Sequence, residues 1–403
     1  TTAADNITFA TGNIELANGS NLTVDTGAAG GNITIGEIGG TSVETVTLDA
    51  GTGTTSVGVI GSGTEIGALS IGSAENGGIT LNGAITTDGV VTLDGPITLA
   101  TGAITITTAD DAINLQGTVD GGQALTLSSG SAAITADGAI GSSTALTSLT
   151  VNSSGAGTIE ITDIGTSSAA GVSGATAIGN TSTGTLTLDG TVYTTTGTQT
   201  YTAATGGGNI DITNTAGTTF TTTNTAVAFN TSGVDLANNA TTTIDTGTGA
   251  GDVTFQGAIE TNGGDNDILT VTSGTGTVTF TGAIGATEEL GGLNVNASSG
   301  NGVITFTSTI GDSDNAGVIG TTSIGNAATS DLNFNSTIYK FDGATTITAA
   351  SGDTIDMGAG AATTFTTAAD NITFATGNIE LANKTNLTVD TGAAGGNITI
   401  GEI

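Results

Sequence analysis

Residues 277–285 read TVTFTGAIG, and this stretch contains the pattern on which the whole chain is built. Val278 and Phe280 are large and apolar and are separated by one polar residue, which is the period-2 alternation of a strand with one buried face. Gly282 then interrupts the strand, and Ile284 returns an apolar side chain to the interior. We expect the glycine to turn the chain, because a corner needs backbone angles that residues with a Cβ avoid.

Both parts of this stretch, the strand and the glycine corner that follows it, recur along the chain. Each strand part is short and is bounded by Gly, Asn, Asp or Ser, which are turn residues. The lone proline, Pro96, lies in one of the corner parts, where a missing N–H is tolerated. The strand part appears as NITF (6–9), NITI (32–35), GITL (78–81), AINL (112–115), NIDI (209–212), DVTF (252–255) and VITF (303–306). The corner part appears as LNGAI (81–85), LDGPI (93–97), LQGTV (115–119), LDGTV (188–192) and FQGAI (255–259).

The spacing of these strands predicts the fold. Strands about 7–12 residues apart allow two or three of them in a coil of about 20–25 residues. We therefore expect an all-β chain that forms a right-handed parallel β-helix, or β-solenoid, an elongated rod of about 16–18 coils. Inward Ile, Leu, Val and Phe would form rows along a narrow core, which accounts for the 10 Phe, 3 Tyr and absent Trp. The alternative is a string of immunoglobulin-like sandwiches, which repeat at roughly 100 residues around a buried Trp.

A much longer repeat joins the two ends of the sequence. Residues 1–38 and 366–403 are identical at 36 of 38 positions, at an offset of 365 residues. The two differences replace Gly19 and Ser20 by Lys384 and Thr385. We interpret 1–365 as one unit of a tandem array in a longer polypeptide and 366–403 as the start of the next unit. Degenerate internal copies can be aligned at about 113–258 and 253–403.

Charge and composition exclude several classes of function. The chain has 36 acidic and 2 basic residues, Lys340 and Lys384, with no His and no Cys. Nothing here can neutralise the phosphates of a nucleic acid or the headgroups of an anionic membrane. No apolar run reaches about 18 residues, so we expect no membrane insertion in this segment. Disorder is disfavoured by the mean hydropathy of +0.22 and by the regular alternation of apolar residues.

Catalysis is not expected. A polysaccharide lyase on a β-helix needs Arg or Lys to hold the anionic substrate and to act as a base. A hydrolase can work with carboxylates alone, and Asp110–Asp111 and Glu288–Glu289 are candidate pairs. Neighbours in a strand point to opposite faces, so these pairs fit solvated turns better. Without His or Cys, no Ser–His or Cys–His arrangement can be built.

Two acidic loops are candidate calcium sites. Asp265 and Asp267 lie in GGDNDILTV (263–271), which resembles one copy of the calcium-binding nonapeptide of toxin-type repeats. Asp312 and Asp314 lie in DSDN (312–315). Carboxylate oxygens suit a hard cation such as Ca²⁺. The alternative interpretation is that both loops are polar turns between strands. We expect the protein to require no cofactor, and calcium is the ion that these loops would hold.

Asparagine and threonine supply two further patterns. Asn6, Asn32, Asn371 and Asn397 each precede a strand, and we expect their amides to hydrogen-bond neighbouring coils. The alternative is glycan attachment, because Asn-Ile-Thr is an acceptor sequence. Outward threonines such as those of TLTL (185–188) could order water and bind ice if they align, although their spacing in the sequence is irregular.

The stretches VTFTGAIG (278–285), VTLDGPIT (91–98) and AIGSSTALTSLTV (139–151) resemble repeats of large bacterial surface proteins. These are the filamentous-haemagglutinin-like adhesins, autotransporter passengers and giant repeat proteins. The resemblance implies an extracellular rod, filament or coat on a bacterial cell surface, with self-association head to tail or laterally. The alternative is an adhesin stalk or passenger that binds a carbohydrate, such as a cell-surface glycan, or another cell. Exposed aromatics would favour that alternative, and the tyrosines are Tyr193, Tyr201 and Tyr339.

Overall fold

The computed structural model describes residues 1–72, 77–231, 233–264, 266–297, 302–382 and 385–401. The described residues form strands, bridges, turns and bends and no helix. Accordingly, no helix of the described chain is long and apolar enough to cross a membrane. The chain divides into two compact units, unit 1 (Thr1–Gly190 and Thr202–Ala204) and unit 2 (Thr191–Tyr201 and Thr205–Ile403).

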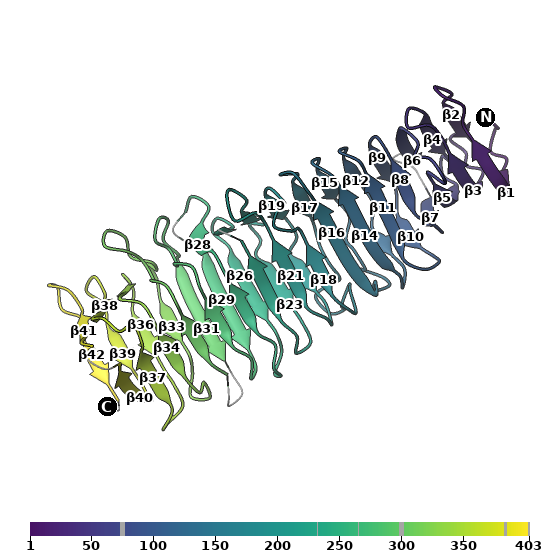
Figure 1. The fold of residues 1–403 in the computed structure, drawn as a ribbon. Coiled ribbons are helices and arrows are strands. Elements are labelled where there is room, and N and C mark those ends of the chain that lie inside the picture. Colours follow the sequence, from purple (N-terminus) through teal and green to yellow (C-terminus); the bar gives the residue numbers. More distant parts are fainter. Residues whose placement is uncertain (73–76, 232, 265, 298–301, 383–384, 402–403) are drawn as a thin grey trace. The chain divides into compact units, whose positions relative to one another are not determined.

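Each unit is a parallel β-solenoid, and the two together contain about 16 turns. In unit 1, β12 (Ile113–Leu115) pairs in parallel with β9 (Val91–Asp94) on one side and with β15 (Ile134–Ala136) on the other. In unit 2, β30 (Val278–Phe280) lies in the same way between β27 (Val253–Phe255) and β32 (Ile304–Phe306). Figure 1 shows the strands of each unit side by side as successive rungs. The predicted parallel stacking of coils is therefore confirmed.

Alternation of burial explains why these residues form strands. In β12, Ile113 and Leu115 are buried and Asn114 is half-buried between them. In unit 1, one buried row runs from coil to coil in register, so that apolar side chains meet only apolar neighbours. This row contains Leu48, Ile71, Leu93, Leu115, Ala136, Ile161 and Leu188.

Coil length varies more than the sequence pattern predicts. Residues paired in register lie 18 positions apart at Ile79 and Ile97 but 29 apart at Leu293 and Thr322. The loops between strands absorb this difference, while the strands keep their register. Loops tolerate changes of length cheaply, because the entropy of closing a loop grows only slowly with its length.

Buried hydroxyls close many of the corners. The Thr26 hydroxyl donates to the carbonyl oxygen of Gly31 at 2.8 Å, and the Thr246 hydroxyl donates to that of Gly251 at 2.8 Å. Both threonines are buried, and each directly follows a strand. A buried hydroxyl is tolerated when it is hydrogen-bonded, and here the bond also satisfies a turn carbonyl.

Aromatic side chains are concentrated in unit 2. Every Phe and Tyr except Phe9 is fully buried there. Five phenylalanines stack as one row, with ring centroids 4.8–5.4 Å apart and ring planes within 8° of parallel. The row contains Phe229, Phe255, Phe280, Phe306 and Phe334.

The strands of the two units are the following. Unit 1 contains β1 (Ile7–Glu15), β2 (Leu22–Asp25), β3 (Ile33–Gly39), β4 (Thr45–Asp49), β5 (Thr54–Ile60), β6 (Ala68–Gly72), β7 (Gly78–Leu81), β8 (Ile85–Thr87), β9, β10 (Ile97–Leu99), β11 (Ile104–Thr108), β12, β13 (Val119–Asp120), β14 (Ala124–Ser129), β15, β16 (Ser148–Ser153), β17 (Ile159–Ile161), β18 (Thr176–Ile178) and β19 (Leu186–Leu188). Unit 2 contains β20 (Val192–Thr194), all but the last residue of β21 (Gln199–Thr202), β22 (Ile210–Ile212), β23 (Thr218–Thr221), β24 (Val227–Asn230), β25 (Gly233–Leu236), β26 (Thr241–Asp245), β27, β28 (Ala258–Thr261), β29 (Ile268–Ser273), β30, β31 (Gly292–Ala297), β32, β33 (Thr322–Ile324), β34 (Leu332–Phe334), β35 (Ile338–Lys340), β36 (Thr345–Ile347), β37 (Thr354–Met357), β38 (Thr363–Thr366), β39 (Ile372–Phe374), β40 (Asn378–Leu381), β41 (Leu387–Asp390) and β42 (Ile398–Ile400).

Candidate functional site

A row of polar side chains, most of them threonine, lies between the buried rows of unit 1. Strand pairing places these residues in register on successive coils, and each is half-buried or exposed. The irregular spacing of threonines in the sequence therefore becomes a regular row in the fold, because the loops absorb the differences in coil length. The row contains Thr23, Thr47, Ser70, Thr92, Asn114, Thr135, Glu160 and Thr187.

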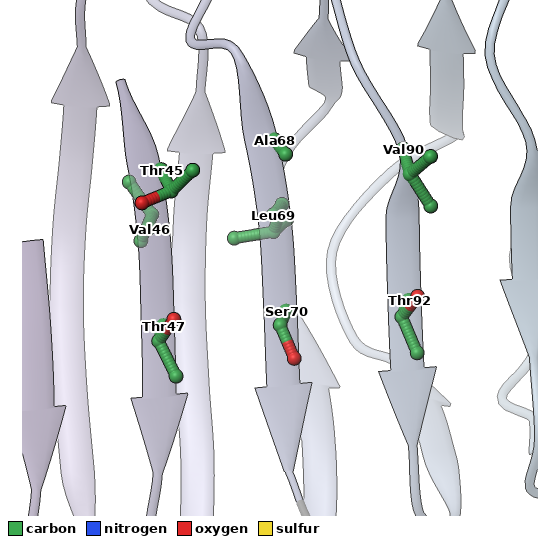
Figure 2. Close-up of a pocket in the computed structure, with 8 residues that line it drawn as sticks. All are labelled: Thr45, Val46, Thr47, Ala68, Leu69, Ser70, Val90 and Thr92. Atoms are coloured by element: carbon green, nitrogen blue, oxygen red, sulfur yellow. The ribbon is translucent and has the colours of Figure 1, made fainter. Parts of the chain in front are cut away.

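Part of this row lines a shallow hollow of about 340 Å³ over β4, β6 and β9. Figure 2 shows the side chains of Thr45 and Thr47 on β4, Ser70 on β6 and Thr92 on β9 along three neighbouring strands. Ala68, Val90, Val46 and Leu69 complete the lining, which contains no ionisable side chain. Such a surface can donate and accept hydrogen bonds and pack methyl groups, but its side chains supply no general acid or base.

Three carboxylates form a second row, in unit 2. The row contains three residues in register on successive coils: Asp211 on β22, Asp235 on β25 and Glu260 on β28. The backbones of neighbouring strands are about 4.8 Å apart along the stack. All three side chains are half-buried. The Asn209 amide donates to Asp235 Oδ2 at 2.8 Å, and the backbone N–H of Glu288 donates to Glu260 Oε2 at 2.9 Å.

Burial and like charge change the acidity of this row. Burial raises the pKa of Asp211, and the neighbouring Asp235 carboxylate raises it further. Burial also raises the pKa of Glu260, while hydrogen bonds from the backbone of Glu288 and Thr287 oppose that rise. The fold therefore raises the pKa of both Asp211 and Glu260 above their ordinary values. When the row is ionised, its neighbouring carboxylates repel one another.

We expect Asp235→Asn to stabilise unit 2 at neutral pH by about 0.5 kcal/mol, the size of a like-charge pair on neighbouring strands after solvent screening. Because the folded-state pKa values of Asp211 and Glu260 are raised, wild-type stability should increase as the pH falls through those values toward the ordinary 3.8 and 4.5. The variant should show a smaller increase. Urea unfolding followed by tyrosine fluorescence measures this, because all 3 Tyr lie in unit 2.

The matched control is Asp245→Asn in the same unit. Asp245 lies in register between Thr221 and Thr272, so removing its charge relieves no carboxylate pair. An Asp235→Asn variant with the pH profile of the wild type would show that the row does not store repulsion.

The first predicted calcium loop is used structurally. Asp265 lies outside the described residues. Asp267 is fully buried, and its Oδ1 accepts the backbone N–H of Asn239, while its carbonyl oxygen accepts the N–H of Gly291. Asp267 therefore connects the coils on either side of its own. Among the described residues, no group of three or more acidic side chains could hold a metal ion.

The second predicted calcium loop is closed by its own atoms and by a lysine. Asp312 Oδ1 accepts the backbone N–H groups of Asp314 and Asn315, each at 2.7 Å. These two bonds, and the positive charge of Lys340 more weakly, hold the pKa of Asp312 below its usual value. Lys340 Nζ donates to the carbonyl oxygens of Asp314 at 2.8 Å and Ser313 at 3.3 Å. The Lys340 ammonium thus contacts the backbone of the loop that was predicted to bind calcium, and calcium binding here stays a prediction.

Replacing Lys340 by methionine is expected to speed hydrogen exchange in residues 312–315 by about twofold to fivefold, the effect of losing one exposed ionic contact. Lys340→Arg should retain most of the protection, because it keeps the charge. If calcium binds this loop as the sequence predicts, added Ca²⁺ should slow the exchange of Lys340→Met more than that of the wild type. Unchanged exchange in Lys340→Met would show that the ammonium does not organise the loop.

The other sequence candidates lie in turns or in the core. Asp110 is exposed between β11 and β12, and its Oδ1 accepts the backbone N–H of Ser131 at 2.9 Å, which lowers its pKa. Glu288 is exposed in the loop before β31. Asp111 and Glu289 are half-buried in the same turns. The tyrosines that an exposed sugar-binding face would need are each fully buried: Tyr193, Tyr201 and Tyr339.

The asparagine prediction is confirmed at three positions. The Oδ1 atoms of Asn6 and Asn371 accept the backbone N–H of Asn32 and Asn397 on the next coil, each at 2.8 Å. Asn32 Oδ1 in turn accepts the N–H of Thr54 at 3.0 Å. These amides bridge coils at the start of strands, as expected. Aspartates such as Asp110 do the same, a use of carboxylates that the sequence analysis did not anticipate.

Comparison of this chain with protein-family models, with curated proteins and with solved structures found no match.

Proposed function

We propose that this chain is a structural segment of an extracellular repeat protein, which forms a rod, filament or coat on a bacterial cell surface without catalysing a reaction. The observation that carries the proposal is the ladder of parallel coils whose sequence returns after 365 residues with 36 of 38 positions unchanged. A stack of coils extends by adding more of the same coils, since each coil contacts only its neighbours.

Three further features support a mechanical role. The core rows of each unit run through many coils, so resistance to unfolding is distributed along the chain. Only 2 residues are Lys or Arg, which leaves trypsin-like proteases little to cut. The net charge of −34 is spread over 403 residues, which limits self-repulsion and keeps the surface hydrated.

The carbohydrate-binding adhesin is the less favoured candidate. Sugar recognition commonly uses exposed aromatic rings, and all three tyrosines are buried in unit 2. The row of polar side chains in unit 1 could bind a flat partner through hydrogen bonds, but nothing on it selects a sugar.

Surface labelling of the producing cells tests the proposal. Antibodies against unit 1 should decorate intact cells in immunogold electron microscopy, and proteinase K should remove the label without lysis. A cytoplasmic protein serves as the control for leakage. Label confined to the cell interior would refute the surface role.

A further inference from the structure

The two units differ in the side chains that fill their cores. In unit 1 the largest buried side chains are Leu and Ile, and Phe9 in β1 is the only aromatic residue. In unit 2, ring contacts continue without a break from Tyr193 to Phe374, because further rings join both ends of the row of five phenylalanines. The joining contacts, between ring centroids, are Tyr193–Tyr201 at 6.1 Å, Tyr201–Phe229 at 5.3 Å, Phe334–Phe365 at 5.1 Å and Phe365–Phe374 at 5.5 Å.

A buried polar cluster, the Gln199 cluster, lies where the aromatic core of unit 2 begins. Gln199 on β21 is fully buried, and its Nε2 donates to the carbonyl oxygens of Tyr193 at 2.7 Å and Thr221 at 3.0 Å. Nε2 also donates to the Thr195 hydroxyl at 3.2 Å, while Oε1 accepts the Tyr201 hydroxyl at 3.0 Å. The cluster thus connects β20 and β21 to β23, the strand that pairs with β20 on the next coil. Such a network opens as a whole, because a partly broken one leaves buried polar groups unpaired.

We propose that the two units open as separate cooperative blocks, and that unit 1 opens first, under tension or in denaturant, while the ring contacts and the Gln199 cluster hold unit 2 together. The inference rests on the proposed function, because it says how a structural rod would lengthen under tension without coming apart. The offset of 365 residues between the near-identical segments would make the two kinds of block alternate along a tandem array.

The ring contacts are large enough to separate the two blocks. An aromatic pair favours the folded state by a factor of about two to ten beyond the burial of its surface. The contacts in unit 2 join successive coils, and the interfaces between coils determine the stability of a solenoid, so these factors multiply along the unit. Repulsion within the carboxylate row of unit 2 acts in the opposite direction, but a screened pair of like charges is comparable with only one weak ring pair.

Urea unfolding of the intact chain tests the order of opening. Circular dichroism reports on the strands of both units, whereas tyrosine fluorescence reports on unit 2, because all 3 Tyr lie there. We expect about half of the dichroic change to precede the change in fluorescence, since the two probes coincide only in a single transition. Hydrogen exchange should be about tenfold or more faster in β9, β12 and β15 than in β27, β30 and β32. Coincident transitions, or a unit 2 that opens first, would overturn the proposal.

Gln199→Met tests the polar cluster, because methionine fills a similar volume but makes none of the four hydrogen bonds. The fluorescence transition should move to lower urea, toward that of unit 1, and exchange in β20, β21 and β23 should accelerate about tenfold or more, as expected when buried polar groups lose their partners. Thr200→Ala is the matched control on the same strand, because Thr200 alternates with the two buried residues and is itself half-buried. It should leave both transitions in place. An unchanged fluorescence transition in Gln199→Met would contradict the role of the cluster.

Stretching single chains in an optical trap measures the same order under tension. Unit 1 should open at the lower force and release up to about 3.3–3.6 Å for each of residues 1–190, and unit 2 should open in a later step at a higher force. A single step that releases the whole chain would refute separate blocks. Both experiments use the purified chain, so their failure leaves the surface role to be judged by the labelling of cells, and label confined to the cell interior would leave the order of opening unchanged.

Discussion

Phe280→Ala is expected to lower the free energy of unfolding of unit 2 by about 3–5 kcal/mol, the range for removing a fully buried phenylalanine. Phe280 is 1% exposed and stacks on Phe255 and Phe306, with centroid distances of 5.4 and 5.0 Å. The backbone spacing of the coils is fixed by strand pairing, so neighbouring rings cannot close the gap that alanine would leave. The cavity should therefore remain largely unrelaxed.

Urea unfolding followed by tyrosine fluorescence measures this loss, because the fluorescence reports on unit 2 alone. Phe280→Leu should cost less, since leucine refills part of the volume. Leu381→Ala is the second comparison, because Leu381 belongs to unit 2, is 48% exposed and lies outside the ring row. A loss below about 1 kcal/mol for Phe280→Ala would show that the row collapses around the cavity, against the usual behaviour of close-packed cores.

The row of five stacked phenylalanines shows how much of the fold can be predicted from the sequence. The period-2 phrases predict inward Val278 and Phe280 and the parallel stacking of their strands, and both are confirmed. The few aromatics of the chain were attributed to a narrow core. The structure refines this interpretation, since unit 2 accommodates a continuous row of rings, whereas the large buried side chains of unit 1 are aliphatic. The register of the paired strands decides which side chains stack on one another. Because the coils differ in length, this register cannot be read from the sequence.

The candidate sites were harder to predict for the same reason. Asp211, Asp235 and Glu260 become neighbours only through strand pairing, although each is the outward residue of a short strand phrase. The loop sequence suggests calcium at Asp312, and this stays a prediction. The contact of Lys340 with the same loop comes from a later coil, which the loop sequence does not reveal.

Glu44 is a further case that the sequence analysis missed. Its carboxylate is fully buried, and it accepts hydrogen bonds from the Thr41 hydroxyl and from the backbone N–H groups of Thr41 and Gly19. These bonds, with that of the Thr41 hydroxyl foremost, lower its pKa to about 2. No basic residue takes part in these bonds. In a chain with 2 basic residues, backbone amides thus take the role that Lys or Arg often has beside a buried acid.

The reason given for the corner glycines holds at Gly95, which has a φ of +138°, but not at every corner. The sequence analysis attributed them to backbone angles closed to other residues. Gly117 has no such angle, and its constraint is the neighbouring coil: a Cβ built on Gly117 would lie 2.1 Å from the carbonyl oxygen of Gly95. A Cβ on Gly138 would lie 2.3 Å from the backbone of Gly117 in the same way. Glycines on three successive coils thus stack with their backbones in close contact.

Gly117→Ala is therefore expected to destabilise this part of unit 1 by about 3 kcal/mol, the upper end of the usual cost of overpacking, because only backbone atoms can give way. Hydrogen exchange of β12, β13 and β15 should accelerate accordingly. Gly122→Ala is the matched control, because a Cβ there meets nothing within 4 Å. It should be neutral, or slightly stabilising through the reduced entropy of the unfolded chain. Equal effects of the two substitutions would mean that glycine is needed for flexibility rather than for the close approach of coils. A large effect confined to Gly117 would show that the spacing between coils sets the corner sequence.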